Sequence, residues 1–130
     1  MYTTCGVGRT LGFIDRLALE LGPVDPVILA LSEKPLAPPF ISGPRDTHLG
    51  TNAEFFIHSD WPAAFDVVHL DVVDPEGSSV AHYAGNLSVM QGAASKLLPL
   101  AFNDKPDIWT IRARDLLSGA TATAELKVEQ

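Results

Sequence analysis

The amino-acid sequence predicts a mainly β protein, an antiparallel β-sandwich preceded by a short N-terminal helical segment. From residue 51 onward, apolar and polar side chains alternate in short runs, as they do in strands with one buried face. These runs recur about every ten residues and are separated by turns rich in Gly, Pro and Asp, a spacing typical of sandwiches. Before residue 34, the apolar side chains instead follow helical spacing.

The composition is that of a folded domain that does not bind nucleic acid. The chain has 130 residues, of which 46% are hydrophobic, enough for one domain with a packed core. Charged residues make up 19% of the chain, and the formal net charge is −7. Because a phosphate backbone is bound by clustered Lys and Arg, and the basic residues here are scattered, nucleic acid is not expected as a partner.

Membrane insertion is not expected either. The longest apolar run, residues 27–31, is far shorter than the roughly 20 residues that span a bilayer. Near the N-terminus, Asp15 and Arg16 interrupt the apolar stretch that a secretory signal requires, so an export signal is not expected in this chain. The single cysteine, Cys5, has no internal disulfide partner, and the compartment is left open.

The predicted helical segment comprises residues 1–33. Apolar spacing predicts one helix over residues 9–21, ended by Gly22 and Pro23, and a second over residues 27–32, begun by Pro26. The apolar face of the first helix has to be buried against a sheet or a partner. Its members are the candidate interface residues: Phe13, Ile14, Leu17 and Leu21.

Residues 34–50 are predicted to be a connector or an extended edge segment. Four prolines and two glycines in this stretch are incompatible with a helix or a central strand. The sandwich is therefore expected to comprise residues 51–130.

Five further runs are assigned as strands after a first strand over residues 52–59. The second, residues 65–74, has Val68, Leu70 and Val72 on its inner face and ends at the turn Asp-Pro-Glu-Gly. Residues 79–83 are expected to pair with it as a hairpin. Residues 96–102 form an edge or bulged strand because of Pro99, with Leu98, Leu100 and Phe102 inward.

The last two strands form the hairpin with the clearest alternation. Residues 107–115 place Trp109, Ile111 and Ala113 inward, and residues 121–128 return after a turn at Ser118 and Gly119. Trp109 is accordingly expected in the core.

No catalytic, cofactor-binding or metal-binding residues are predicted, and the chain is not expected to be an enzyme. The opening pattern Gly6-x-Gly8-x-x-x-Gly12 lacks the preceding buried strand and the βαβ unit of a dinucleotide site. The four histidines lack the spacing of paired metal ligands, and no Gly-x-Ser-x-Gly nucleophile motif is present.

Two aromatic residues are candidates for stacking on a ligand, Trp61 and Tyr83. Trp61 precedes a proline in a loop between strands, and aromatic rings near loop ends can stack on sugar rings. The alternative for Trp61 is packing on the end of the sandwich.

The region from Phe65 to Val128 resembles bacterial immunoglobulin-like and macroglobulin-like β-sandwich modules. The resemblance rests on three stretches: VVHLDVVDPEGSSVAHY, LPLAFNDKPDIWTIRARD and SGATATAELKV. It implies an immunoglobulin-like sandwich of the kind appended to large multidomain proteins, including glycoside hydrolases. Many members have Gly at the position of Asp107, so the turn before that strand is expected to differ here.

The expected function is that of a non-catalytic structural or protein-interaction module. Its partners would be other domains or proteins, including a second copy bound through the N-terminal helices. One alternative is a carbohydrate-binding module that uses the two loop aromatics. The other is a small hydrolase or isomerase with a histidine and a carboxylate between the helices and the sheet.

Overall fold

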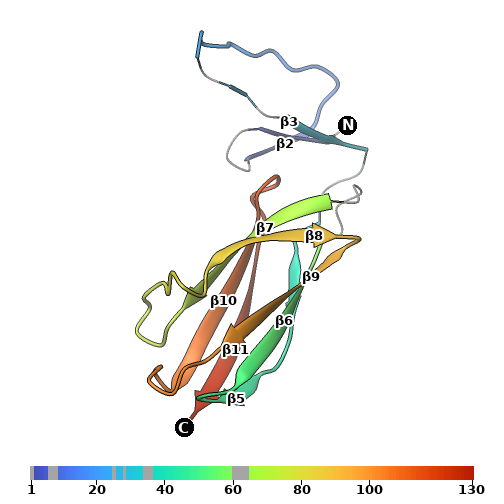
Figure 1. Ribbon diagram of the computed structural model, residues 1–130. Coiled ribbons are helices and arrows are strands. Elements are labelled where there is room, and N and C mark those ends of the chain that lie inside the picture. The colour runs from blue at the N-terminus through green and yellow to red at the C-terminus, as the bar shows by residue number, and fades with distance from the viewer. Residues whose placement is uncertain (1, 6–8, 25, 28, 34–36, 60–64) are drawn as a thin grey trace.

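The computed structural model describes residues 2–5, 9–24, 26–27, 29–33, 37–59 and 65–130 of the chain (Figure 1). All regular structure in this described part is β, as two separate sheets. A three-stranded sheet is formed by β1 (Tyr2–Cys5), β2 (Arg9–Phe13) and β3 (Leu29–Ser32). The other eight strands form the sandwich: β4 (Phe40–Ser42), β5 (Asp46–His48), β6 (Asn52–His58), β7 (Phe65–Val73), β8 (Gly85–Met90), β9 (Ala93–Pro99), β10 (Asp107–Asp115) and β11 (Thr121–Glu129).

The eight strands run in the order β4-β6-β9-β8-β7-β10-β11-β5 and fold into two layers. One layer is β4-β6-β9 and the other is β8-β7-β10-β11-β5. Among the described strands, ladder pairing connects the two layers at the β8–β9 hairpin, where Met90 pairs with Ala93. At the opposite side, the chain crosses from β4 to β5, so that β4 pairs with β6 while β5 pairs in parallel with β11.

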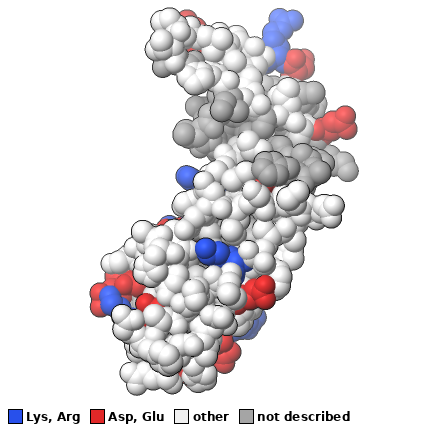
Figure 2. Space-filling view, in the orientation of Figure 1, with Lys and Arg blue, Asp and Glu red and all other residues white. Residues whose placement is uncertain are grey.

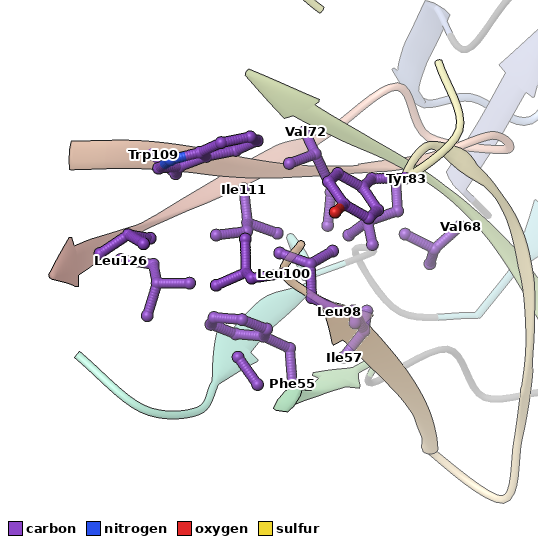
Figure 3. Packing of buried hydrophobic residues seen from close by; sticks show 14 of the residues in the cluster. Phe55, Ile57, Val68, Val72, Tyr83, Leu98, Leu100, Trp109, Ile111 and Leu126 are labelled. Atoms are coloured by element: carbon purple, nitrogen blue, oxygen red, sulfur yellow. The ribbon is translucent and has the colours of Figure 1, made fainter. Parts of the chain in front are cut away.

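The core fills the space between these two layers (Figure 3). Phe55, Ile57 and Leu98 come from the β4-β6-β9 layer and face Trp109 and Ile111 from the other. All are buried, because alternate residues of each strand point to the same side. The predicted inner faces of β7 (Val68, Leu70, Val72) and β10 (Trp109, Ile111, Ala113) are confirmed by the burial of these side chains.

Gly43 lies where the chain crosses between the layers. A Cβ atom built on Gly43 would lie 2.5 Å from Cδ1 of Phe55, whose ring is buried. The crossing therefore requires a residue without a side chain, and Pro44 follows it with a fixed φ. The predicted connector is thus in part sandwich, since it contributes β4 and β5.

The predicted N-terminal helices are wrong within the described residues. Residues 9–13 form β2, residues 14–22 continue without regular structure, and residues 29–32 form β3. Gly12 has a φ of +81°, a left-handed conformation incompatible with a helix. Strand β1 pairs with β2 on one side and β3 on the other, so backbone pairing has overridden the helical spacing.

Two strand assignments also differ from the sequence expectation. The partner of β7 is β8, not residues 79–83, where only Ser79 forms a bridge, to Val73. Strand β9 ends at Pro99, so Phe102 lies beyond it and is 85% exposed rather than inward. A proline has no N–H to continue the ladder, which explains why the strand stops there.

Candidate interaction site

Exposed apolar side chains concentrate near the N-terminus. Of thirteen large hydrophobic side chains that are exposed among the described residues, seven lie between residues 13 and 31. Val24 is 84% exposed, Phe13 70% and Leu21 66%. We call this set the N-terminal apolar surface: Phe13, Leu17, Leu19, Leu21, Val24, Val27 and Leu31.

The four predicted interface residues belong to this region but not to a helix. Phe13 ends β2, and Ile14, Leu17 and Leu21 follow it in the segment without regular structure. Ile14 is half-buried, whereas the other three are exposed. The structure therefore keeps three of the four as accessible apolar residues, although it removes the helical face that was expected to align them.

A second apolar surface covers the outer side of β4, β6 and β9. Phe40, Phe56 and Leu97 are 60%, 42% and 50% exposed. The register pairs Phe40 with His58, and the two rings stack with centroids 4.4 Å apart. The sequence held a signal for this surface in the adjacent residues Phe55 and Phe56, because alternation along a strand sends one ring inward and the other outward.

Tyr83 is not available for ligand stacking, which corrects the sequence expectation. Its side chain is 4% exposed and packs edge-on against Trp109, with ring centroids 6.0 Å apart. Its hydroxyl oxygen lies 2.9 Å from the carbonyl oxygen of Pro99 and 2.5 Å from Oδ2 of Asp104, so its single hydrogen is shared between two acceptors. Burial followed by the Asp104 contact raises the pKa of Tyr83 to about 12. The ring is a core element. The other stacking candidate, Trp61, lies outside the described residues.

Two buried carboxylates face each other at one end of the sandwich. Asp66 accepts hydrogen bonds from Ser59 Oγ (2.6 Å) and from the backbone N–H of Val67 (2.7 Å). Asp115 accepts from the backbone N–H groups of Leu117 (2.7 Å) and Ser118 (3.2 Å). Burial, with a contribution from the Asp115 charge, raises the pKa of Asp66. These bonds tie loops to β7 and β10, which is a structural role.

The described residues contain no candidate metal site. No group of three His, Cys, Asp or Glu side chains that could hold a metal ion occurs there. His58 and His69 lie on β6 and β7, which are not neighbours in the sheet order. Along the same described ranges, no helix is long and apolar enough to cross a membrane.

Described residues line two shallow hollows on the outer face of the five-stranded layer. One, of about 230 Å³, is lined by His69, Asp71, Arg112 and Arg114. The other, of about 340 Å³, is lined by Arg45, Ile108, Glu125 and Lys127. Figure 2 shows acidic and basic groups in small, separate clusters with wide uncharged areas between them. Neither hollow is enclosed by aromatic side chains.

Comparison with known proteins bears on the fold. No family model matches the chain, and no curated protein matches it in sequence. Among solved structures, a CARDB domain from Pyrococcus furiosus, determined in complex with di-metal ions, is 15% identical with a TM-score of 0.51. That match covers 70% of this chain and 90% of the CARDB chain.

A PKD domain of an M14-like peptidase from a Thermoplasmatales archaeon is 19% identical with a TM-score of 0.43, over 76% of this chain and all of that one. The two-layer strand order and the CARDB likeness agree on the architecture. The chain has an immunoglobulin-like β-sandwich fold.

Proposed function

We propose that this chain is a non-catalytic structural and protein-interaction module that binds its partner through the N-terminal apolar surface. The observation that supports this is the concentration of exposed apolar side chains between residues 13 and 31. Exposed apolar patches on soluble proteins often mark interaction sites, and one short stretch of the chain supplies all seven of these side chains. The residues of the described hydrophobic core all belong to the eight-stranded sandwich, and none belongs to the N-terminal apolar surface.

The partner proposed is a second copy of the chain. In the order β2-β1-β3, both outer strands have one edge that no described strand covers. Such an edge presents unpaired N–H and C=O groups that can pair with the same edge of a copy about a twofold axis. Burial of apolar side chains from both copies would stabilise the dimer by about 25 cal/mol for each Å² of apolar surface removed from water.

Light scattering coupled to size exclusion tests this proposal on the full chain. The expected result is a dimer for the natural sequence and a monomer for the double variant Leu21→Ser, Val24→Ser. The control is Leu97→Ser, which makes the same kind of change on the outer side of β9 and is expected to leave the dimer intact. A natural chain that stays monomeric at high concentration would reject self-association.

Glycan binding now rests on Trp61 alone, because Tyr83 is buried. A glycan array read with the natural chain and with Trp61→Ala tests it. Signal that survives the substitution, or no signal at all, would remove this alternative. A role as one module of a larger protein, as the resemblance to appended sandwich modules implies, belongs to the same proposal.

A further inference from the structure

We propose that the hollow on the outer face of β7 and β10 binds an extended acidic peptide segment through Arg112 and Arg114. This site is separate from the N-terminal apolar surface and does not depend on self-association. The hollow has a volume of about 230 Å³ and is lined by His69, Asp71, Arg112 and Arg114.

The strand register places the residues that line this hollow on two neighbouring strands, β7 and β10, with β11 on the other side of β10. Arg114 lies opposite His69 on β7 and Thr121 on β11. Arg112, two residues earlier, lies opposite Asp71 and Thr123. Because residues two apart on a strand share a face, both guanidinium groups lie on the solvent side of the sheet.

The positive charge in the hollow is only partly neutralised. Asp71 accepts a hydrogen bond from Ser79 Oγ, and its Oδ2 is 4.0 Å from NH1 of Arg112, at the outer limit of an ion pair. Arg114 makes no ion pair or hydrogen bond with any residue the structure describes. The described lining of the hollow holds two guanidinium groups and one carboxylate, so it is net positive in a chain whose net charge is −7.

His69 adds a further polar group beside Arg114. Its Nδ1 lies 2.8 Å from Oδ1 of Asn86, a hydrogen bond in which Nδ1 is the donor when it carries the ring proton. This bond fixes the ring, and Nε2 is the nitrogen left for a ligand. On β11, Thr121 lies opposite Arg114 and Thr123 lies opposite Arg112.

The geometry favours a peptide over a sugar. Two residues along a strand span about 6.6 Å, so Arg112 and Arg114 match carboxylates at alternate positions of an extended Glu-x-Glu segment. Arg binds carboxylates through a planar pair of N–H groups. Of the four side chains that line the hollow, His69 alone is aromatic, whereas sugar sites use larger aromatic platforms.

Fluorescence anisotropy with a labelled peptide tests the proposal on the full chain. The probe is acetyl-(Glu-Thr)4-amide, and the comparison peptide is acetyl-(Gln-Thr)4-amide. We expect only the acidic peptide to bind, with an affinity that falls as salt is added. Arg114→Gln should weaken binding about tenfold, since each hydrogen bond between charged groups contributes on the order of 1.5 kcal/mol. Arg112→Gln should have a smaller effect, because Asp71 already shares its charge.

The matched control is Arg45→Gln, which removes the same charge at the other hollow of the same face. It should change the affinity less than twofold. Equal loss from Arg45→Gln and Arg114→Gln would show non-specific attraction and overturn the site. The absence of acidic-peptide binding would also overturn it. Tighter, Arg114-dependent binding of an oligogalacturonate would overturn the assignment to a peptide and identify a sugar carboxylate as the ligand.

Discussion

The hydroxyl of Tyr83 donates a hydrogen bond to the backbone carbonyl of Pro99 across 2.9 Å. The same hydroxyl contacts Oδ2 of Asp104, which also accepts the backbone N–H of Ala101 at 2.8 Å. One buried ring thus fixes both the end of β9 and the loop that leads to β10. These hydrogen bonds connect the two layers at a level where β8 and β9 are not paired with each other.

Replacing Tyr83 by Phe should destabilise the protein by about 1–3 kcal/mol, because a carbonyl and a carboxylate lose their buried donor. Urea unfolding monitored by tryptophan fluorescence measures this. The pKa of Tyr83 in the folded protein is raised to about 12 from 10.0, so its stabilising contribution is present below pH 10 and is lost as pH rises through about 12. The stability difference between natural chain and variant should shrink over that interval. An unchanged difference from pH 9 to pH 12 would contradict this.

Asp107 has a φ of +125°, a conformation that glycine adopts readily and other residues rarely do. Glycine is also the residue that many of the resembling modules have at this position. Asp107→Gly should therefore stabilise the protein by about 1 kcal/mol, since removing the strained side chain outweighs the entropy that glycine adds to the unfolded state. Thermal unfolding tests this, with Asp104→Gly as a control that should destabilise. A lower midpoint for Asp107→Gly would show that the Asp107 Oδ1 bond to the N–H of Ile108 matters more.

Gly43→Ala should destabilise by about 1–3 kcal/mol, because the new methyl group meets the buried ring of Phe55 at 2.5 Å. Gly77→Ala is the comparison. A Cβ atom at Gly77 would meet nothing within 4 Å, so the loss of stability in this variant would come from the φ of +84° alone. Restoration of stability by the double change Gly43→Ala, Phe55→Leu would confirm that the contact is responsible.

Asp66→Asn should flatten the pH dependence of stability. Burial raises the pKa of Asp66 above its ordinary value of 3.8, so the protonated carboxyl group is favoured in the folded state. The stability that this group contributes to the fold is therefore fully present below pH 3.8 and is lost as pH rises through the folded pKa. An amide keeps the bond from Val67 and can donate to Ser59, without a buried charge. Above the folded pKa of Asp66, the variant should be at least as stable as the natural chain. Parallel pH profiles for the two proteins would contradict the prediction.

The sequence alone determined the strands of the sandwich core. Alternation identifies β6, β7, β10 and β11, because a strand with one buried face needs an apolar residue at every second position. The hairpin of β10 and β11 follows from this pattern and the short turn between them. For the candidate interaction site, helical spacing singled out Leu17 and Leu21; the helix is wrong, but both side chains are exposed.

Only the tertiary structure decided the secondary structure of the N-terminal segment and the pairing of the other strands. Short apolar runs fit helix and strand alike, and at β2 and β3 the choice was made by backbone pairing with β1, which lies outside any local pattern. Strands β4 and β5 are three residues each, too short to show a period. The hollow at Arg114 needed the register of β7 and β10, because hydrogen bonds between distant segments set which side chains become neighbours.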